Sequence, residues 1–152
     1  MARTIADTLT NYKVVGIDTS PFIYHFQGEA LYSKITTDLF NAVEKGLIRA
    51  VTSVITLMEV LVKPMSEGNV KAAEEYRILL QTFPNLSLRT IDDKVAARAA
   101  DLRASYRIRA PDALQLSAAI EEGAKAFVTN DERLSKVKDV PVLTLKSFLA
   151  RK

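Results

Sequence analysis

The 152-residue chain has no cysteine and only one histidine, His25. The lack of cysteine excludes disulfides, a thiolate nucleophile and cysteine-ligated metals. A single histidine excludes zinc sites that need two, and a serine–histidine mechanism would have to use His25. His25 lies in an aromatic turn, Phe22–Phe26, where packing or surface exposure is the more common role of a histidine. We therefore expect any acid–base or metal chemistry to rest on carboxylates.

The chain also has no apolar run that approaches the roughly 20 residues of a membrane span. Residues 1–13 lack the long apolar core of a signal peptide. These absences suit a cytoplasmic protein with no membrane association. Lys and Arg outnumber Asp and Glu by 21 to 18, which gives a formal charge of +3. If several acids gather in one site, the remaining surface is more basic and favours a polyanionic partner, although plain solubility explains such a charge equally well.

Short apolar runs alternate with helical stripes along the whole chain. The runs predict strands at 14–17, 48–53, 86–90, 126–129 and 141–145. The stripes predict helices at 21–27, 31–44, 54–62, 70–82, 93–106, 111–120 and 146–151. This alternation predicts a three-layer α/β/α fold with a mainly parallel sheet of roughly four to five strands. We expect a single domain over residues 1–152, with residues 1–13 as a short polar arm or helix before the first strand.

The run Val14–Ile17 leads directly into a carboxylate, Asp18. Such a run is typical of a strand that is buried on both faces. Asp18 would then stand at the carboxyl end of the strand, where open α/β sheets bind their ligands. Thr19, Ser20 and Pro21 follow it and resemble the start of a helix. The alternative is that Asp18 only caps that helix.

Three further carboxylates occupy similarly apolar settings. Glu59 lies in a helix that is apolar nearly all round and should be buried, so its charge needs a partner or a metal. Asp112 lies in the first turn of a helix rich in small residues, and Asp131 follows a buried strand as Asp18 does. The alternatives are an arginine partner or an exposed position for Glu59, and ordinary helix-start or turn roles for Asp112 and Asp131.

Strand ends and the helix starts that follow them gather along one edge of a doubly wound sheet. We therefore expect these four acids to meet in one crevice. Two carboxylates 4 Å apart repel by about 4 kcal/mol at an effective dielectric of 20, so protons or a divalent cation must be shared. Oxygen ligands without histidine or cysteine suit Mg²⁺ or Mn²⁺, which activate water and stabilise a leaving oxygen at phosphate centres.

The chain resembles the PIN-domain ribonucleases, most closely the VapC-type toxins of toxin–antitoxin pairs. The likeness spans residues 14–147 and rests on VVGIDTSPFIY, TSVITLMEVL, RAPDALQLSAAI and AFVTNDERL. It implies a PIN-like fold and a Mg²⁺- or Mn²⁺-dependent endoribonuclease that hydrolyses RNA with a metal-activated water. In this family the catalytic metal ligands match Asp18, Glu59, Asp112 and Asp131. A cognate antitoxin and a homodimer are also implied.

The resemblance assigns supporting roles to neighbouring polar residues. Thr129 and Asn130 match the polar lead-in to Asp131 and would support it. Thr19 or Ser20 would hold a metal-bound water. Two departures leave this site intact: about a dozen residues precede the first strand, where the family often has almost none, and an acid directly follows Asp131 without an assigned role.

Basic and aromatic residues suggest how partners bind. Four arginines are candidates to steer RNA phosphates, although a solvated helix face explains them equally well: Arg103, Arg107, Arg109 and Arg133. The aromatic turn 22–26, with Tyr32, either lines a groove for an antitoxin or packs in the core, which is the more common role.

Two other functions remain open, and a third is disfavoured. The chain could be a PIN-domain nuclease of RNA processing that is not a toxin, or an inactive PIN-fold domain that binds RNA or protein. A haloacid-dehalogenase-like phosphatase would need a second aspartate two residues after Asp18, where Ser20 stands.

Overall fold

The computed structural model describes residues 3–150 of the chain. Its strands form a single five-stranded sheet in the order β3-β2-β1-β4-β5, and each neighbouring pair is parallel. The strands are β1 Val14–Ile17, β2 Arg49–Ser53, β3 Leu86–Arg89, β4 Ala126–Thr129 and β5 Val142–Thr144. The predicted parallel sheet of four to five strands is therefore confirmed.

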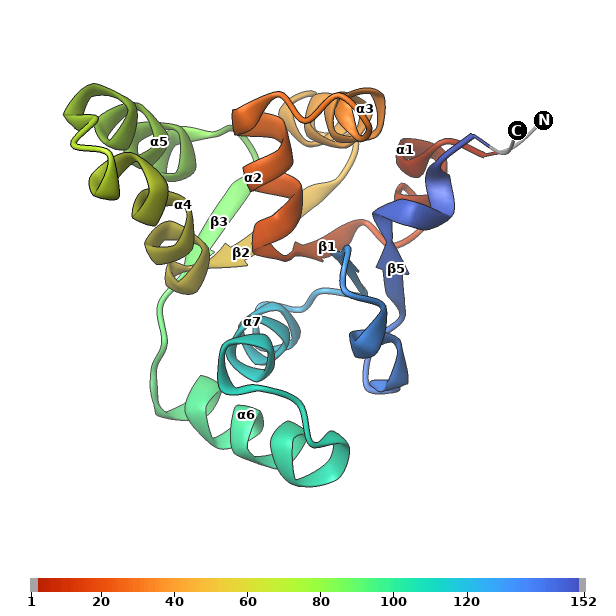
Figure 1. Cartoon of the computed structure of the whole chain (residues 1–152). Coiled ribbons are helices and arrows are strands. Elements are labelled where there is room, and N and C mark those ends of the chain that lie inside the picture. The colour runs from red at the N-terminus through yellow and green to blue at the C-terminus, as the bar shows by residue number, and fades with distance from the viewer. Residues whose placement is uncertain (1–2, 151–152) are drawn as a thin grey trace.

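Helices cover both faces of the sheet, as Figure 1 shows. The first five lie on one face and the last two on the other, which makes three layers. The α-helices are α1 Ile5–Leu9, α2 Thr19–Gln27, α3 Ser33–Glu44, α4 Val54–Ser66, α5 Val70–Thr82, α6 Asp93–Tyr106 and α7 Ala110–Glu121. Two short 3₁₀ turns follow the last strands, η1 Glu132–Lys136 and η2 Leu145–Phe148. The predicted α/β/α fold is thus confirmed.

The central strand β1 fixes how closely α7 approaches the sheet. Val15 and Ile17 face the core beneath the first five helices, so Gly16 between them faces the opposite layer. A Cβ at Gly16 would lie 2.5 Å from Cβ of Ala119 and 2.9 Å from Cδ1 of Phe127. Only glycine therefore allows α7 to pack directly on the β1 backbone. This contact sets the position of the start of α7 relative to the end of β1.

The predicted N-terminal arm is partly a packed helix. Thr4 caps α1 in a reciprocal capping box with Asp7. Ile5 and Leu9, one helical turn apart, are 2% and 0% exposed and belong to the main core. The first two residues of the predicted arm lie outside the described residues. The segment before β1 therefore adds apolar burial to the fold.

Helix α4 differs from its prediction in length and in burial. It passes through Pro64, where an end was expected, and continues to Ser66. Pro64 gives up a helical hydrogen bond but is buried, and regular bonding resumes where Glu67 N–H donates to Lys63 O at 3.1 Å. The expectation that α4 is buried was wrong for its outer face: three apolar side chains there are more than half exposed, namely Met58, Val62 and Met65.

The end of the chain forms less helix than the sequence predicted. A helix was expected over 146–151, but the structure has the short turn η2 at Leu145–Phe148. Residue 151 of the prediction lies outside the described residues. None of the helices in the described part of the chain is long and apolar enough to cross a membrane.

Candidate active site

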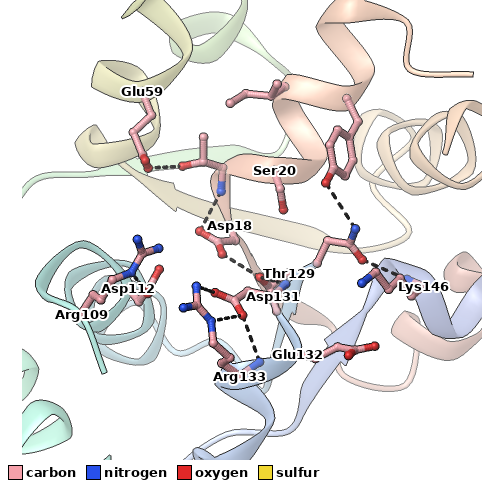
Figure 2. Close-up of a pocket in the computed structure, with 14 residues that line it drawn as sticks. Asp18, Ser20, Glu59, Arg109, Asp112, Thr129, Asp131, Glu132, Arg133 and Lys146 are labelled. Carbon is pink, nitrogen blue, oxygen red and sulfur yellow. Dashed lines mark hydrogen bonds and ion pairs between the residues drawn. The ribbon is translucent and has the colours of Figure 1, made fainter. Parts of the chain in front are cut away.

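The carboxyl ends of β1 and β4 open into a pocket of about 490 Å³ that all four candidate acids line (Figure 2). Asp18 and Asp131 follow these two strands, Asp112 lies in the first turn of α7, and Glu59 lies in the second turn of α4. The structure therefore brings together four acids that are far apart in the sequence. Their role as metal ligands stays a prediction.

Asp18 is the most deeply placed of the four, with 9% of its surface exposed. Its Oδ1 accepts hydrogen bonds from Thr19 N–H at 2.8 Å and from Gln115 Nε2 at 3.3 Å. Its Oδ2 accepts from the Thr129 hydroxyl at 2.7 Å. Burial raises the pKa of Asp18, the negative charge of Asp112 adds to the rise, and these hydrogen bonds oppose it. Asp18 thus caps α2 and also presents a poorly compensated carboxylate to the pocket.

Gln115 connects the elements beneath Asp18. Its Nε2 is 2.7 Å from the Thr56 hydroxyl and 3.0 Å from the Thr19 hydroxyl, and its Oε1 accepts from Ser53. Gln115 is 3% exposed, so each of these groups depends on the network for its hydrogen bonds. A single amide therefore ties the start of α2, the end of β2 and α4 to α7.

Glu59 is held by a hydroxyl and makes no ion pair with a described residue. The Thr19 hydroxyl donates to Glu59 Oε1 at 2.7 Å (Figure 2). Because Thr19 also accepts from Gln115, the position of Glu59 is coupled to the network under Asp18. The alternative of an arginine partner for Glu59 is thus wrong for the described residues.

The two acids at the rim are each paired with an arginine. Asp112 Oδ2 is 3.2 Å from Arg109 Nε. Asp131 accepts two bonds from the Arg133 guanidinium, at 2.8 and 3.0 Å, and also caps η1. The Arg133 side chain lowers the pKa of Asp131 below its ordinary value. Both arginines are largely exposed, at 67% and 70%, so they are free to move.

The acids of the pocket do not enclose a ready-made ion site among the described residues. No three acidic or histidine side chains among residues 3–150 stand as a metal-binding group. Two of the four carboxylates are turned toward arginines (Figure 2). The chemistry of the donors still fits Mg²⁺ or Mn²⁺, because every donor is a carboxylate oxygen. The raised pKa of Asp18 also marks a place where a cation would stabilise the ionised form.

Comparison with known proteins decides the family. The family model described as PIN domain matches residues 15–140. This chain belongs to the PIN-domain family. No curated protein matches it significantly. The match includes all four acids of the pocket, so the predicted family resemblance is confirmed.

Solved structures share this PIN fold at low sequence identity. A toxin–antitoxin complex from Klebsiella pneumoniae is 22% identical, with a TM-score of 0.66 and coverage of 86% of this chain and 97% of that chain. VapBC2 from Rickettsia felis, bound to a DNA fragment from its promoter, is 19% identical, with a TM-score of 0.64 and coverage of 86% and 98%. VapC20 from Mycobacterium tuberculosis, a toxin that cleaves the sarcin–ricin loop, is 12% identical, with a TM-score of 0.60 and coverage of 74% and 86%.

The polar residues expected to support Asp131 or to hold a metal-bound water in this PIN domain divide into two groups. Thr129 and Thr19 contact Asp18 and Glu59 directly. Asn130 bonds elsewhere, and the Ser20 hydroxyl is buried without a hydrogen bond to any described residue. Thr19 is thus committed to an acid, whereas Ser20 remains available to a ligand.

The four candidate arginines also fall into two groups, those that line the pocket and those that do not. Arg109 and Arg133 line the pocket. Arg103 and Arg107 do not: Arg103 Nε donates to Ile108 O at 3.2 Å, and Arg107 ends α6 in the left-handed conformation, with φ +55°. Arg103 and Arg107 thus lie outside the pocket, and a role of the four arginines in steering RNA phosphates stays a prediction.

Sequence reasoning missed Gln115 and Lys146, which also belong to this region of the PIN domain. A usable signal existed for Gln115, because it lies three residues after Asp112 in a helix of small and apolar residues. That spacing places both on one helical face. A signal also existed for Lys146, because it directly follows the predicted strand 141–145 and the carboxyl ends of parallel strands share one edge of the sheet.

Proposed function

We propose that this PIN domain is a divalent-metal-dependent endoribonuclease and the toxin of a toxin–antitoxin pair. The observation that carries the proposal is the meeting of four carboxylates, which are far apart in the sequence, in one pocket. All four are held by specific hydrogen bonds or ion pairs rather than left in solvent, and Asp18 is buried at a cost that a cation would offset.

Each residue has a definite part in the proposed reaction. Asp18, Glu59, Asp112 and Asp131 would hold Mg²⁺ or Mn²⁺, which supplies a positive charge that activates water and stabilises the leaving oxygen of a phosphodiester. Thr129 and Gln115 orient Asp18 from behind, and Thr19 orients Glu59. The arginines at the rim, Arg109 and Arg133, would bind phosphates of the strand once they leave their carboxylates.

The proposal of an antitoxin partner and a homodimer rests on similar folds and on one surface. Several structures with this fold are toxin–antitoxin complexes. Helix α4 exposes Met58, Val62 and Met65 at spacings of four and three residues, which form one apolar stripe. An exposed stripe of this kind favours a protein partner. We place this proposed toxin in the cytoplasm, where its RNA substrate would be.

A second candidate is a PIN-fold domain that binds RNA or protein without catalysis. One observation favours it: the acids among residues 3–150 do not stand as a ready metal-binding group. Rotation of two exposed arginines away from Asp112 and Asp131 would remove this objection. The two candidates differ in whether the protein consumes RNA.

The test is cleavage of a labelled mixed-sequence RNA by the full chain, with Mg²⁺, with EDTA and with Asp18→Asn. We expect cleavage only by the wild type with Mg²⁺, and a loss of at least about 100-fold in D18N, because the substitution removes one charge from the ion's ligands. The matched control is Asp101→Asn, an exposed position on α6 that should keep full activity. Equal cleavage under all conditions, or none by the wild type, would refute the proposal.

A further inference from the structure

The pocket has a second half that the four acids do not use. Ser20, Tyr24, Asn130 and Lys146 line it together with the acids. Figure 2 shows Lys146 on the opposite side of Asp18 from Asp112 and Arg109. An RNA strand that places one phosphodiester at the acids must lay its neighbouring nucleotide over one of these sides. The half around Lys146 is therefore a candidate for the neighbouring nucleotide.

Lys146 supplies the uncommitted positive charge of the pocket. Of the three basic residues that line it, Arg109 and Arg133 are paired with Asp112 and Asp131. Lys146 is exposed and has no carboxylate within 4.0 Å among residues 3–150. Its ammonium group can therefore bind an anion without first breaking an ion pair, whereas each arginine must leave its partner.

Asn130 holds this half of the pocket together. Its Oδ1 accepts from the backbone N–H of Lys146 at 3.1 Å, and its Nδ2 donates to the Tyr24 hydroxyl at 3.3 Å. The side chain thus ties η2, which carries Lys146, to α2, which carries Tyr24 and Ser20. Asn130 was expected to support Asp131, but its hydrogen bonds position Lys146 instead.

Ser20 provides a buried hydroxyl on the same side. Its Oγ is the buried side-chain oxygen or nitrogen that finds no hydrogen-bond partner among the described residues. Ser20 lies in the first turn of α2, and its hydroxyl points into the pocket (Figure 2). An unpaired buried hydroxyl costs stability unless a ligand completes it. A phosphate oxygen is a strong acceptor for such a donor.

We propose that Lys146 and Ser20 form a second phosphate site, which binds the phosphodiester next to the one positioned at the four acids. The ammonium group of Lys146 neutralises the phosphate and the hydroxyl of Ser20 donates a hydrogen bond to it, while Asn130 keeps the two elements in register. This inference rests on the proposed nuclease function, because it takes the RNA strand to run through the pocket. It assigns to Lys146 a role in positioning substrate.

The first test measures binding of a fluorescein-labelled single-stranded oligouridylate by anisotropy. Ca²⁺, which also takes oxygen ligands, replaces Mg²⁺, and a gel checks that the RNA stays intact. Lys146→Gln should weaken binding about fivefold at low salt. It should also lower the slope of log affinity against log salt by about 0.7, the value for one phosphate contact on a single strand.

The matched control is Lys125→Gln, which removes the same charge from an exposed lysine just before β4, at the opposite end of that strand. We expect its affinity to stay within about twofold of the wild type, because charge so far from the strand is screened. Equal losses in K146Q and K125Q would show that only net charge matters and would overturn the second phosphate site.

A double-mutant cycle tests whether Ser20 shares the phosphate with Lys146. Ser20→Ala should weaken binding in the wild type but much less in the K146Q background, because one contact depends on the other. Additive losses, or no loss in S20A, would overturn the shared site. If the wild type bound no RNA at all, the nuclease proposal itself would fail. Cleavage with normal K146Q binding would overturn only the second phosphate site.

Discussion

The pocket contains two kinds of carboxylate, one at its base and one at its rim, and they are stabilised in opposite ways. At the base, Asp18 is buried among neutral donors, and burial raises its pKa. At the rim, Asp131 is half-buried against the Arg133 guanidinium, which lowers its pKa. An aspartate therefore has only neutral donors around it at the base of the pocket, and a positively charged partner at the rim.

This contrast divides the pocket into a part with fixed geometry and a part with exchangeable charge. The base provides fixed geometry, because hydroxyls and the Gln115 amide hold Asp18 and Glu59 without neutralising them. The rim provides exchangeable charge, because its arginines are exposed and free to swing toward solvent or phosphate. The base should thus be sensitive to changes in packing, and the rim to changes in charge.

The largest effect is expected at the base, from Gln115→Leu. The substitution keeps the volume but removes the partner of Ser53 and of the buried hydroxyls around Asp18. Each orphaned buried group costs about 1–3 kcal/mol, so we expect the free energy of unfolding in urea to fall by about 2–3 kcal/mol. The control is Gln81→Leu on the exposed face of α5, which should change it by less than about 0.5 kcal/mol. Similar values for the two variants would mean that the network does not stabilise the base.

A smaller effect is expected from Asp18→Asn on stability without metal. Because the folded-state pKa of Asp18 is raised, the folded chain binds more protons than the unfolded chain between about pH 3.8 and that pKa. The free energy of unfolding of the wild type therefore falls as pH rises through this window, by about 1.4 kcal/mol for each unit of the shift. D18N has no carboxyl group at this position, so its free energy of unfolding does not fall for this reason.

Thermal unfolding in EDTA at about pH 3 and about pH 7 measures the difference. D18N should gain stability relative to the wild type on going from the lower to the higher pH. If the stability difference between the two proteins were the same at both pH values, the ionised Asp18 would not destabilise the folded chain. This result would contradict the opposite stabilisation of the carboxylates at the base and at the rim.

The smallest effect is expected at the rim, from Arg133→Gln. Loss of the guanidinium should return the pKa of Asp131 toward its ordinary value, which carbon-detected NMR of the carboxylates reports. It should also tighten binding of Mn²⁺ by a factor of about two to five, because the ion no longer competes with an arginine. Arg77→Gln, which breaks an exposed ion pair with Glu74 on α5, is the control and should change neither value. Weaker Mn²⁺ binding in R133Q would contradict the role given to the rim.

Most of the fold was predictable because hydrophobic period and strand–helix alternation are properties of the sequence itself. The same pattern placed Asp18 and Asp131 at strand ends, and the parallel topology then required them to share an edge. The pattern failed where tertiary contacts override local preference. A helix over 54–62 was predicted, but α4 continues through the buried Pro64 to Ser66.

The site was predictable at the level of residues but not of contacts. Which carboxylate faces an arginine depends on side-chain rotamers, and the spacing of residues along the sequence does not predict rotamers. The pairing of Asp131 with Arg133, two residues away, was therefore not foreseen. The link from Asn130 to the backbone of Lys146 spans 16 residues and depends on how the loop after β4 meets η2. Contacts of this kind follow only from the assembled structure.

The most direct measurement is calorimetric titration of Mn²⁺ into the wild type, D18N, E59Q and the D101N control. We expect saturable binding to the wild type and to D101N, and affinity at least about tenfold weaker in D18N and E59Q, because both acids of the base would hold the ion. Absence of binding to the wild type, or equal affinity in all four proteins, would contradict the claim that these carboxylates form one cation site.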